Sequence, residues 1–165
     1  MTLHRFTPIT LISALILSLL STAAFAQAVV DVKGAWVRAT VQGQQATGAF
    51  MTLTAKDKTQ LVGVSSSVAG VAEVHEMKMD GDIMKMRALT GGIDLPAGKA
   101  VALKPGGYHV MLMDLKLPLQ KDTTIPLTLV FKDAKGAESN LAIMVPVSTT
   151  APADAGAADH AGHKH

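Results

Sequence analysis

Cysteine is absent from this chain of 165 residues, and aromatic residues are few. A blue-copper electron carrier needs a cysteine thiolate as its short ligand, so that class is excluded. One tryptophan, one tyrosine and four phenylalanines provide no platform for stacking bases, and a formal net charge of +2 predicts no basic patch for nucleic acid. The chain also lacks a Gly-x-Ser-x-Gly elbow, a His-Glu-x-x-His zinc helix and a phosphate-binding loop. These absences predict no nucleic-acid partner and favour a binding protein over an enzyme.

The beginning of the chain has the composition of an export signal. A weakly basic start precedes an apolar run over 11–20, and Ala24-Phe25-Ala26 is a small-x-small cleavage site, so we predict a signal peptide over 1–26. Cleavage after Ala28 fits nearly as well. The apolar run is short for a membrane span, and no cysteine follows it to carry a lipid. We therefore expect a periplasmic protein whose mature chain has no membrane span.

Short runs of β-type residues fill the middle of the chain, and no segment of useful length has a helical period. Gly, Pro and Asp residues separate these runs at intervals typical of a sandwich. The predicted strands are 29–39, 47–55, 60–67, 72–79, 83–89, 100–103, 107–114, 125–132 and 140–147. We expect one all-β domain over 27–147, a sandwich or barrel.

Soft and charged residues alternate through 74–87, with the period of a strand that turns back on itself. Asp80-Gly81 is a strong hairpin signal in the middle of this segment. If these two residues form the loop, the facing pairs are Met77 with Met84 and His75 with Met86. Directly opposed side chains have Cβ atoms about 4.5 to 5.5 Å apart, close enough to reach one metal ion.

A second register is open for the same hairpin. A loop at Gly81-Asp82 would pair Met86 with Met77 instead. The choice of register decides which methionine lies closest to His75.

His109 and Met111 alternate along a further strand, whose faces are both largely apolar. We expect this strand to be buried and to hold its two side chains rigidly, while the hairpin supplies His75 and Met86. Imidazole combined with thioether sulfur is a donor set that favours copper, above all Cu(I). Met77 and Met84 are possible accessory ligands.

Each of these residues also has a structural interpretation. Methionine fills gaps in cores, and a lone strand histidine is more often hydrogen-bonded structure than a ligand. On that ground we assign Met51, Met113 and Trp36 to the core, with Arg38 as a charge at its rim. The hairpin methionines differ, because their neighbours are charged at positions where core strands use Val, Ile or Leu. The joint pattern therefore favours a metal site.

The chain resembles the PCu(A)C family of periplasmic copper chaperones in a spacing and in two short motifs. The spacing is His75-x10-Met86-x22-His109-x-Met111, and the motifs are Met-Lys-Met-Arg at 84–87 and Lys-Pro-Gly-Gly-Tyr-His-Val-Met-Leu-Met at 104–113. The resemblance implies a cupredoxin-like Greek-key β-barrel or sandwich that binds Cu(I) through these two histidines and two methionines. It also implies delivery of copper to the CuA centre of cytochrome c oxidase. The implied partners are cytochrome c oxidase subunit II and thiol-containing copper assembly proteins, and we expect a monomer.

The end of the chain, 148–165, cannot bury a core and is expected to be disordered. Its histidines, His160, His163 and His165, could bind Cu(II), which favours imidazole nitrogen. The alternative is a solvated tail with adventitious affinity. Two other functions stay open for the chain as a whole: a periplasmic copper buffer or resistance protein, and a structural β-domain without metal.

Overall fold

The computed structural model describes residues 30–153, which form ten β-strands and no α-helix. The strands are β1 Val30–Arg38, β2 Ala46–Ala55, β3 Thr59–Ser65, β4 Ala69–Asp80, β5 Ile83–Ala88, β6 Ile93–Leu95, β7 Ala100–Leu103, β8 His109–Leu115, β9 Thr124–Asp133 and β10 Glu138–Ser148. The predicted signal peptide and the three tail histidines lie outside the described residues. Within 30–153, no helix is long and apolar enough to cross a membrane.

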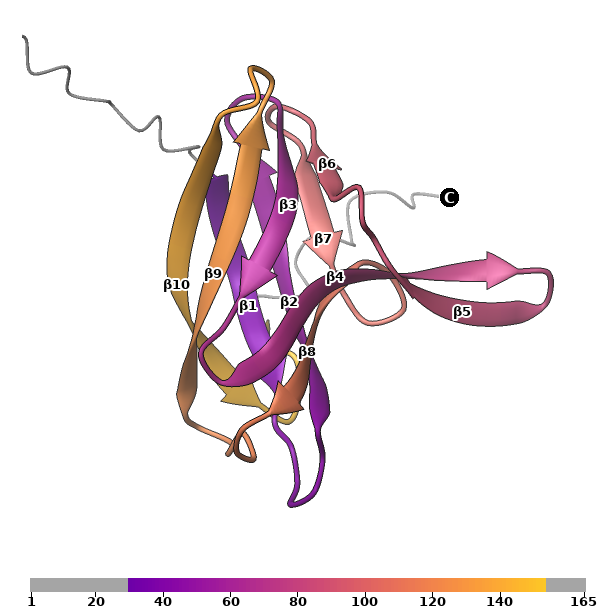
Figure 1. The fold of residues 1–165 in the computed structure, drawn as a ribbon, viewed down its shortest axis with the longest axis vertical. Helices are drawn as coiled ribbons and strands as arrows, with labels where there is room; N and C mark the ends of the chain where they lie inside the picture. The colour runs from indigo at the N-terminus through magenta and orange to yellow at the C-terminus, as the bar shows by residue number, and fades with distance from the viewer. Residues whose placement is uncertain (1–29, 154–165) are drawn as a thin grey trace, which may run out of the picture.

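The strands follow the hydrogen-bonded order β5-β4-β8-β2-β1-β10-β9-β3-β6, and β7 pairs with the part of β2 that β8 leaves free. β1 and β10 are parallel, whereas the other paired strands are antiparallel. Figure 1 shows the sheet folded into a sandwich from which the β4–β5 hairpin projects sideways. The order ends at β5 and β6, so hydrogen bonds do not close the sheet.

One apolar core lies between the two layers. Its fully buried side chains come from both of them and include Leu53, Val110 and Leu112 on one side and Leu61, Leu127, Leu129 and Phe131 on the other. Because side chains alternate along a strand, the residues between these positions face away from the core. The all-β, cupredoxin-like class predicted from the sequence is confirmed.

All nine predicted strands are present, and β6 is the strand that the sequence did not predict. Three residues are too few for an alternating pattern, and the flanking Gly91-Gly92 reads as a break. Gly92 has a φ of +74°, and a Cβ there would lie 2.4 Å from the Leu61 carbonyl oxygen. This close approach of two backbones allows β6 to pair with β3.

The β4–β5 hairpin has the second of the two registers. Asp80 pairs with Ile83, so the loop is Gly81-Asp82, and the facing methionine pairs are Met77 with Met86 and Met79 with Met84. The prediction that Met77 faces Met84 and His75 faces Met86 was wrong, because His75 faces Ala88. Gly81 has a φ of +63° and is the first loop residue, the position that a type II′ turn reserves for glycine.

Candidate metal site

His75 and His109 are directly paired across β4 and β8. Their ring centroids lie 5.9 Å apart with the planes at 62°, and each residue is only 7% exposed. Val74 and Val110, their neighbours in the chain, belong to the core, so both imidazoles lie on the opposite face of the sheet. β8 is the buried strand that the sequence predicted, and it brings the two histidines together.

Each histidine has one ring nitrogen occupied by an oxygen acceptor. His75 Nε2 donates to Glu73 Oε2 at 3.0 Å, and His109 Nδ1 donates to the Gly107 carbonyl oxygen at 3.0 Å. We infer the tautomers from these partners: a neutral imidazole that donates from one nitrogen has a lone pair on the other. The lone pairs are then on His75 Nδ1 and His109 Nε2.

His75 Nδ1 is buried and has no hydrogen-bond partner in the described part of the chain. A buried polar atom without a partner is costly, and metal-binding histidines commonly donate their other nitrogen to a carboxylate or carbonyl oxygen. Both features fit a metal ligand. No group of three or more His, Cys, Asp or Glu side chains that could hold a metal occurs within residues 30–153, so a site here also needs thioether sulfur.

A cavity of about 320 Å³ brings two thioethers to His109. Its lining includes His109, Met111 and Met77, with Arg38, Gly48 and Phe50 among the other residues. Met111 is paired with Glu73 on β4 and with Gly48 on β2, so it lies on the same face as both histidines. The Met77 amide donates to the Gly107 carbonyl oxygen at 3.2 Å, which joins the base of the hairpin to the loop before β8.

The Phe50 side chain forms part of the wall of this cavity and packs against Trp36. The Phe50 ring centroid is 4.8 Å from that of Trp36 and 6.4 Å from that of His109. A Cβ at Gly48 would lie 2.7 Å from Phe50 Cζ, so the ring occupies the space that a side chain at position 48 would fill. Trp36 is buried as predicted, but it packs on this outer face and lies outside the main core cluster. The guanidinium of the exposed Arg38 lies 5.7 Å from the Phe50 ring centroid.

The other sequence-predicted ligands lie farther along the hairpin. Met86 faces Met77, is 49% exposed and does not line the cavity beside His109. Met84 lies one pair closer to the hairpin tip, opposite Met79. Met77 is thus the hairpin methionine that lines the cavity with His109, hereafter the histidine cavity, which His75 does not line. Met86 is directly opposite Met77 on the paired strand.

The methionines that we assigned to the core have different outcomes. Met51 is 2% exposed and belongs to the core cluster, as predicted. Met113 is half-buried on the face of His109 and Met111, outside that cluster, so its assignment to the core was wrong. Both faces of β8 read as apolar in the sequence, which concealed the difference.

Sequence reasoning also missed Glu73 and the Gly107 carbonyl. Glu73 could have been found, because a residue two positions before His75 in a strand shares its face. The role of the Gly107 oxygen had no signal in the sequence, because a backbone acceptor depends on the local path of the chain.

The family of the chain is shown by comparison with known proteins. Residues 30–147 match the LpqE-like family, described as "Putative lipoprotein LpqE-like". The chain belongs to the LpqE-like family. The chain is 36% identical to "Putative lipoprotein Lxx21020" of Leifsonia xyli subsp. xyli over 116 residues, which cover 70% of this chain and 69% of that protein. It is also 32% identical to "Uncharacterized protein RP573" of Rickettsia prowazekii, covering 66% of this chain and 62% of that one.

Solved structures similar to this LpqE-like domain include two copper-bound forms. One is the solution structure of CuI-DR1885 from Deinococcus radiodurans, which is 32% identical to this chain and superposes with a TM-score of 0.58. The alignment covers 79% of this chain and 86% of the other. The other is the copper-bound PCuAC domain from PmoF2, which is 24% identical and has a TM-score of 0.56. Its alignment covers 73% of this chain and 93% of that domain. The second likeness is one of fold alone.

Proposed function

We propose that this protein is an exported copper chaperone that binds Cu(I) through His75, His109, Met111 and a thioether of the Met77–Met86 pair. The observation that carries the proposal is the arrangement of the two imidazoles. Each is held by an oxygen acceptor on one nitrogen, and the other nitrogen of His75 is buried without a partner among the described residues. Met86 is the thioether that the family spacing predicts, and Met77 is the one that lines the cavity.

The donor set favours Cu(I) over other metals. Imidazole nitrogen and thioether sulfur are neutral, and thioether is a soft ligand that suits Cu(I). A site without thiolate leaves the bound ion with its own positive charge, so the incoming thiolates of a partner protein would bind it more strongly. Such a site would hold copper for transfer rather than for catalysis. The Cu(I) form of the 32% identical Deinococcus radiodurans protein supports this assignment.

The remaining features of the proposal concern location and partners. Relatives named as lipoproteins support export, and we propose a periplasmic protein with a signal peptide over 1–26, a copper-binding domain over 27–147 and a tail over 148–165. The recipient would be the CuA centre of cytochrome c oxidase, reached through subunit II and thiol-containing assembly proteins. His160, His163 and His165 of the tail would bind Cu(II).

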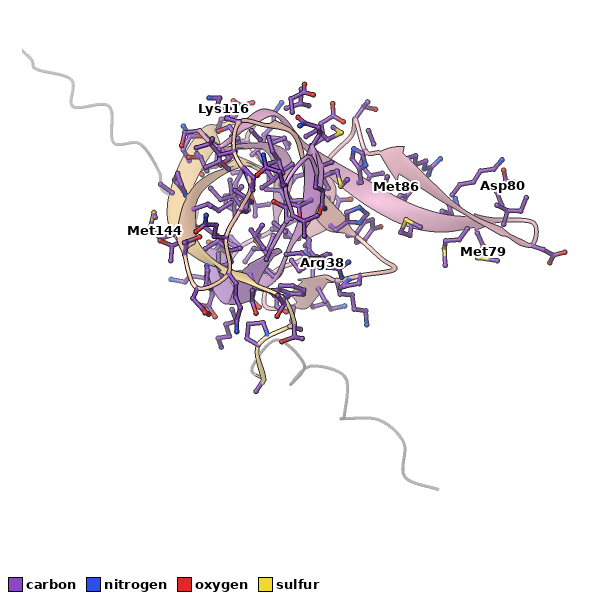
Figure 2. The ribbon with its side chains drawn as sticks, turned by 90° about the horizontal axis from the view of Figure 1, so that it is seen from below. Arg38, Met79, Asp80, Met86, Lys116 and Met144 are labelled. Atoms are coloured by element: carbon purple, nitrogen blue, oxygen red, sulfur yellow. The ribbon has the colours of Figure 1, made fainter. Side chains whose placement is uncertain are left out.

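An anaerobic Cu(I) competition titration against a chromogenic chelator tests the metal site. The protein is purified after export and compared with its His75→Ala/Met86→Leu double variant. We expect one tightly bound Cu(I) per molecule in the parent and its loss in the double variant. Met144→Leu is the matched control, because Met144 is 62% exposed on β10 and Figure 2 shows it on the opposite side of the sandwich from the hairpin. Unchanged binding in the double variant would contradict the proposal.

Transfer separates a chaperone from a copper buffer. Copper-loaded protein is mixed with the soluble CuA-binding domain of oxidase subunit II, and the appearance of the CuA absorption bands is followed. A chaperone loses its copper to that domain, whereas a buffer retains it.

A further inference from the structure

The hairpin beyond the histidines carries a ladder of four methionines on one face. Met77 faces Met86, and Met79 faces Met84 at the next pair toward the tip. Residues two apart in a strand share a face, as do directly paired residues, so all four thioethers lie on the side of the hairpin that continues from His75. Opposed Cβ atoms lie about 4.5 to 5.5 Å apart, a separation that two thioethers on one ion can span.

The other face of the hairpin is built from paired charges. Glu76 and Arg87 form an ion pair, as do Asp80 and Lys85. Both ion pairs lie within the hairpin itself, and Lys78 on the same face is directly opposite Lys85. Pairing between β4 and β8 ends at His75 and His109. Beyond Met77, β4 and β5 therefore pair only with each other.

The outer methionines are exposed to an unusual degree for apolar side chains. Met79 is 54% exposed, and Met84 and Met86 are each 49% exposed. A cavity of about 390 Å³ on the hairpin is lined by Met79 and Met86 together with the charged side chains Lys78, Asp80, Lys85 and Arg87, and Met84 does not line it. Figure 2 shows these two side chains along the projecting arm, with Met79 nearer its tip. Strands with one exposed face normally have polar residues there, so packing does not explain this choice.

We propose that Met79, Met84 and Met86 form a second Cu(I) site, made of thioethers alone, at the outer end of the hairpin. Met86 is the innermost of these three methionines: it is directly opposite Met77, which lines the cavity with His109, and one pair away from Met79 and Met84. Copper bound at the tip could therefore pass inward by exchange of one thioether for another, with Cu(I) unchanged in oxidation state. The inward route rests on the function proposed above, whereas the outer site stands without it.

A docking surface for a protein partner is the competing explanation of an exposed methionine face. The two explanations differ in what they require of sulfur. Leucine has nearly the volume and apolar area of methionine but cannot bind Cu(I), so Met79→Leu/Met84→Leu preserves a hydrophobic face and removes the metal ligands.

The test follows individual methionines by NMR during anaerobic Cu(I) addition to protein labelled with ¹³C at the methionine methyl groups. Single Met→Leu variants assign the resonances. We expect Met111 to shift during the first equivalent and Met79 and Met84 to shift together on addition beyond it, while Met51 and Met144 stay in place. In Met79→Leu/Met84→Leu, the first-equivalent shift of Met111 should be retained, and the later shift of Met86 should be lost.

The outcomes separate the outer site from the proposed function. If Met111 shifts but Met79 and Met84 do not move at any copper excess, the outer site is wrong and the histidine site stands. If Met79 and Met84 shift while Met111 does not, the outer site is supported and the histidine site is wrong. A Met86 response beyond the first equivalent that survives in Met79→Leu/Met84→Leu would also overturn the outer site.

Discussion

Glu73 and Met111 are directly paired across β4 and β8, so the carboxylate that accepts the hydrogen bond from His75 Nε2 lies beside a candidate thioether ligand. The side chain of Glu73 is 45% exposed, whereas that of His75 is 9% exposed. A negative charge at this position would compensate part of the positive charge of Cu(I). The hydrogen bond from His75 to Glu73 orients the imidazole. Glu73 would therefore be a positioning residue for the proposed site.

Replacing Glu73 tests this role. We expect Glu73→Gln to weaken Cu(I) binding by roughly tenfold, because a neutral amide orients the imidazole less firmly and removes the nearby charge. The competition titration measures the change, and thermal unfolding of the copper-free protein should be nearly unaltered. Glu138→Gln is the matched control, since Glu138 is exposed on β10. A purely structural role for Glu73 would lower the melting temperature and leave copper affinity unchanged.

Removing thioethers should separate the two oxidation states of copper. We expect Met86→Leu/Met111→Leu to keep its fold, because a Met to Leu change usually costs less than about 1.5 kcal/mol. Loss of a residue that only hydrogen-bonds to a metal ligand lowers metal affinity by roughly tenfold to hundredfold. Loss of two ligands should lower Cu(I) affinity by more than that, whereas Cu(II) affinity should change little. Equal loss of both ions would contradict a soft site.

Comparison of Met77→Leu with Met86→Leu decides the fourth ligand. Met77 lines the histidine cavity, whereas Met86 matches the family spacing. The variant with the larger loss of Cu(I) affinity identifies the ligand. Equal and negligible losses would show that neither thioether binds the ion.

Gly48→Ala probes the wall of the cavity. The added Cβ would displace the Phe50 ring, which packs against Trp36 and lies beside His109. Forcing an additional methyl group into such a place costs about 1–3 kcal/mol, which thermal unfolding would detect. Gly91→Ala is the control, because a Cβ there would have no atom within 4 Å. An unchanged melting temperature for Gly48→Ala would show that Phe50 moves without cost.

The hairpin turn can be tested in the same way. Gly81 has a φ of +63°, a conformation that costs other residues about 1–2 kcal/mol. We expect Gly81→Ala to reduce amide-exchange protection along the hairpin and to leave the melting of the sandwich nearly unchanged. Asp82→Ala, at the other loop position, should retain protection. Equal effects of the two substitutions would contradict the Gly81-Asp82 loop.

Alternation of side chains made the strands predictable, since a half-buried strand needs an apolar residue at every second position. It could not choose the hairpin register, because soft residues occupy every second position on both strands and either loop keeps them on one face. The choice is seen only in the structure, where Asp80 pairs with Ile83 and Gly81 is the first loop residue. For the same reason the face of Met113 was misjudged, since both faces of β8 are apolar and only the packed layers distinguish them.

The sequence by itself determined the chemistry that this protein can offer a metal: imidazole and thioether at strand spacing, with no thiolate. Donor type depends on residue identity alone, and no fold changes it. Only the tertiary structure decided that His75 faces His109, that Glu73 and the Gly107 carbonyl occupy one nitrogen of each, and that Met77 lies nearer than Met86 to the cavity. Those relationships join residues across strands and loops, and their geometry is set by register and backbone path.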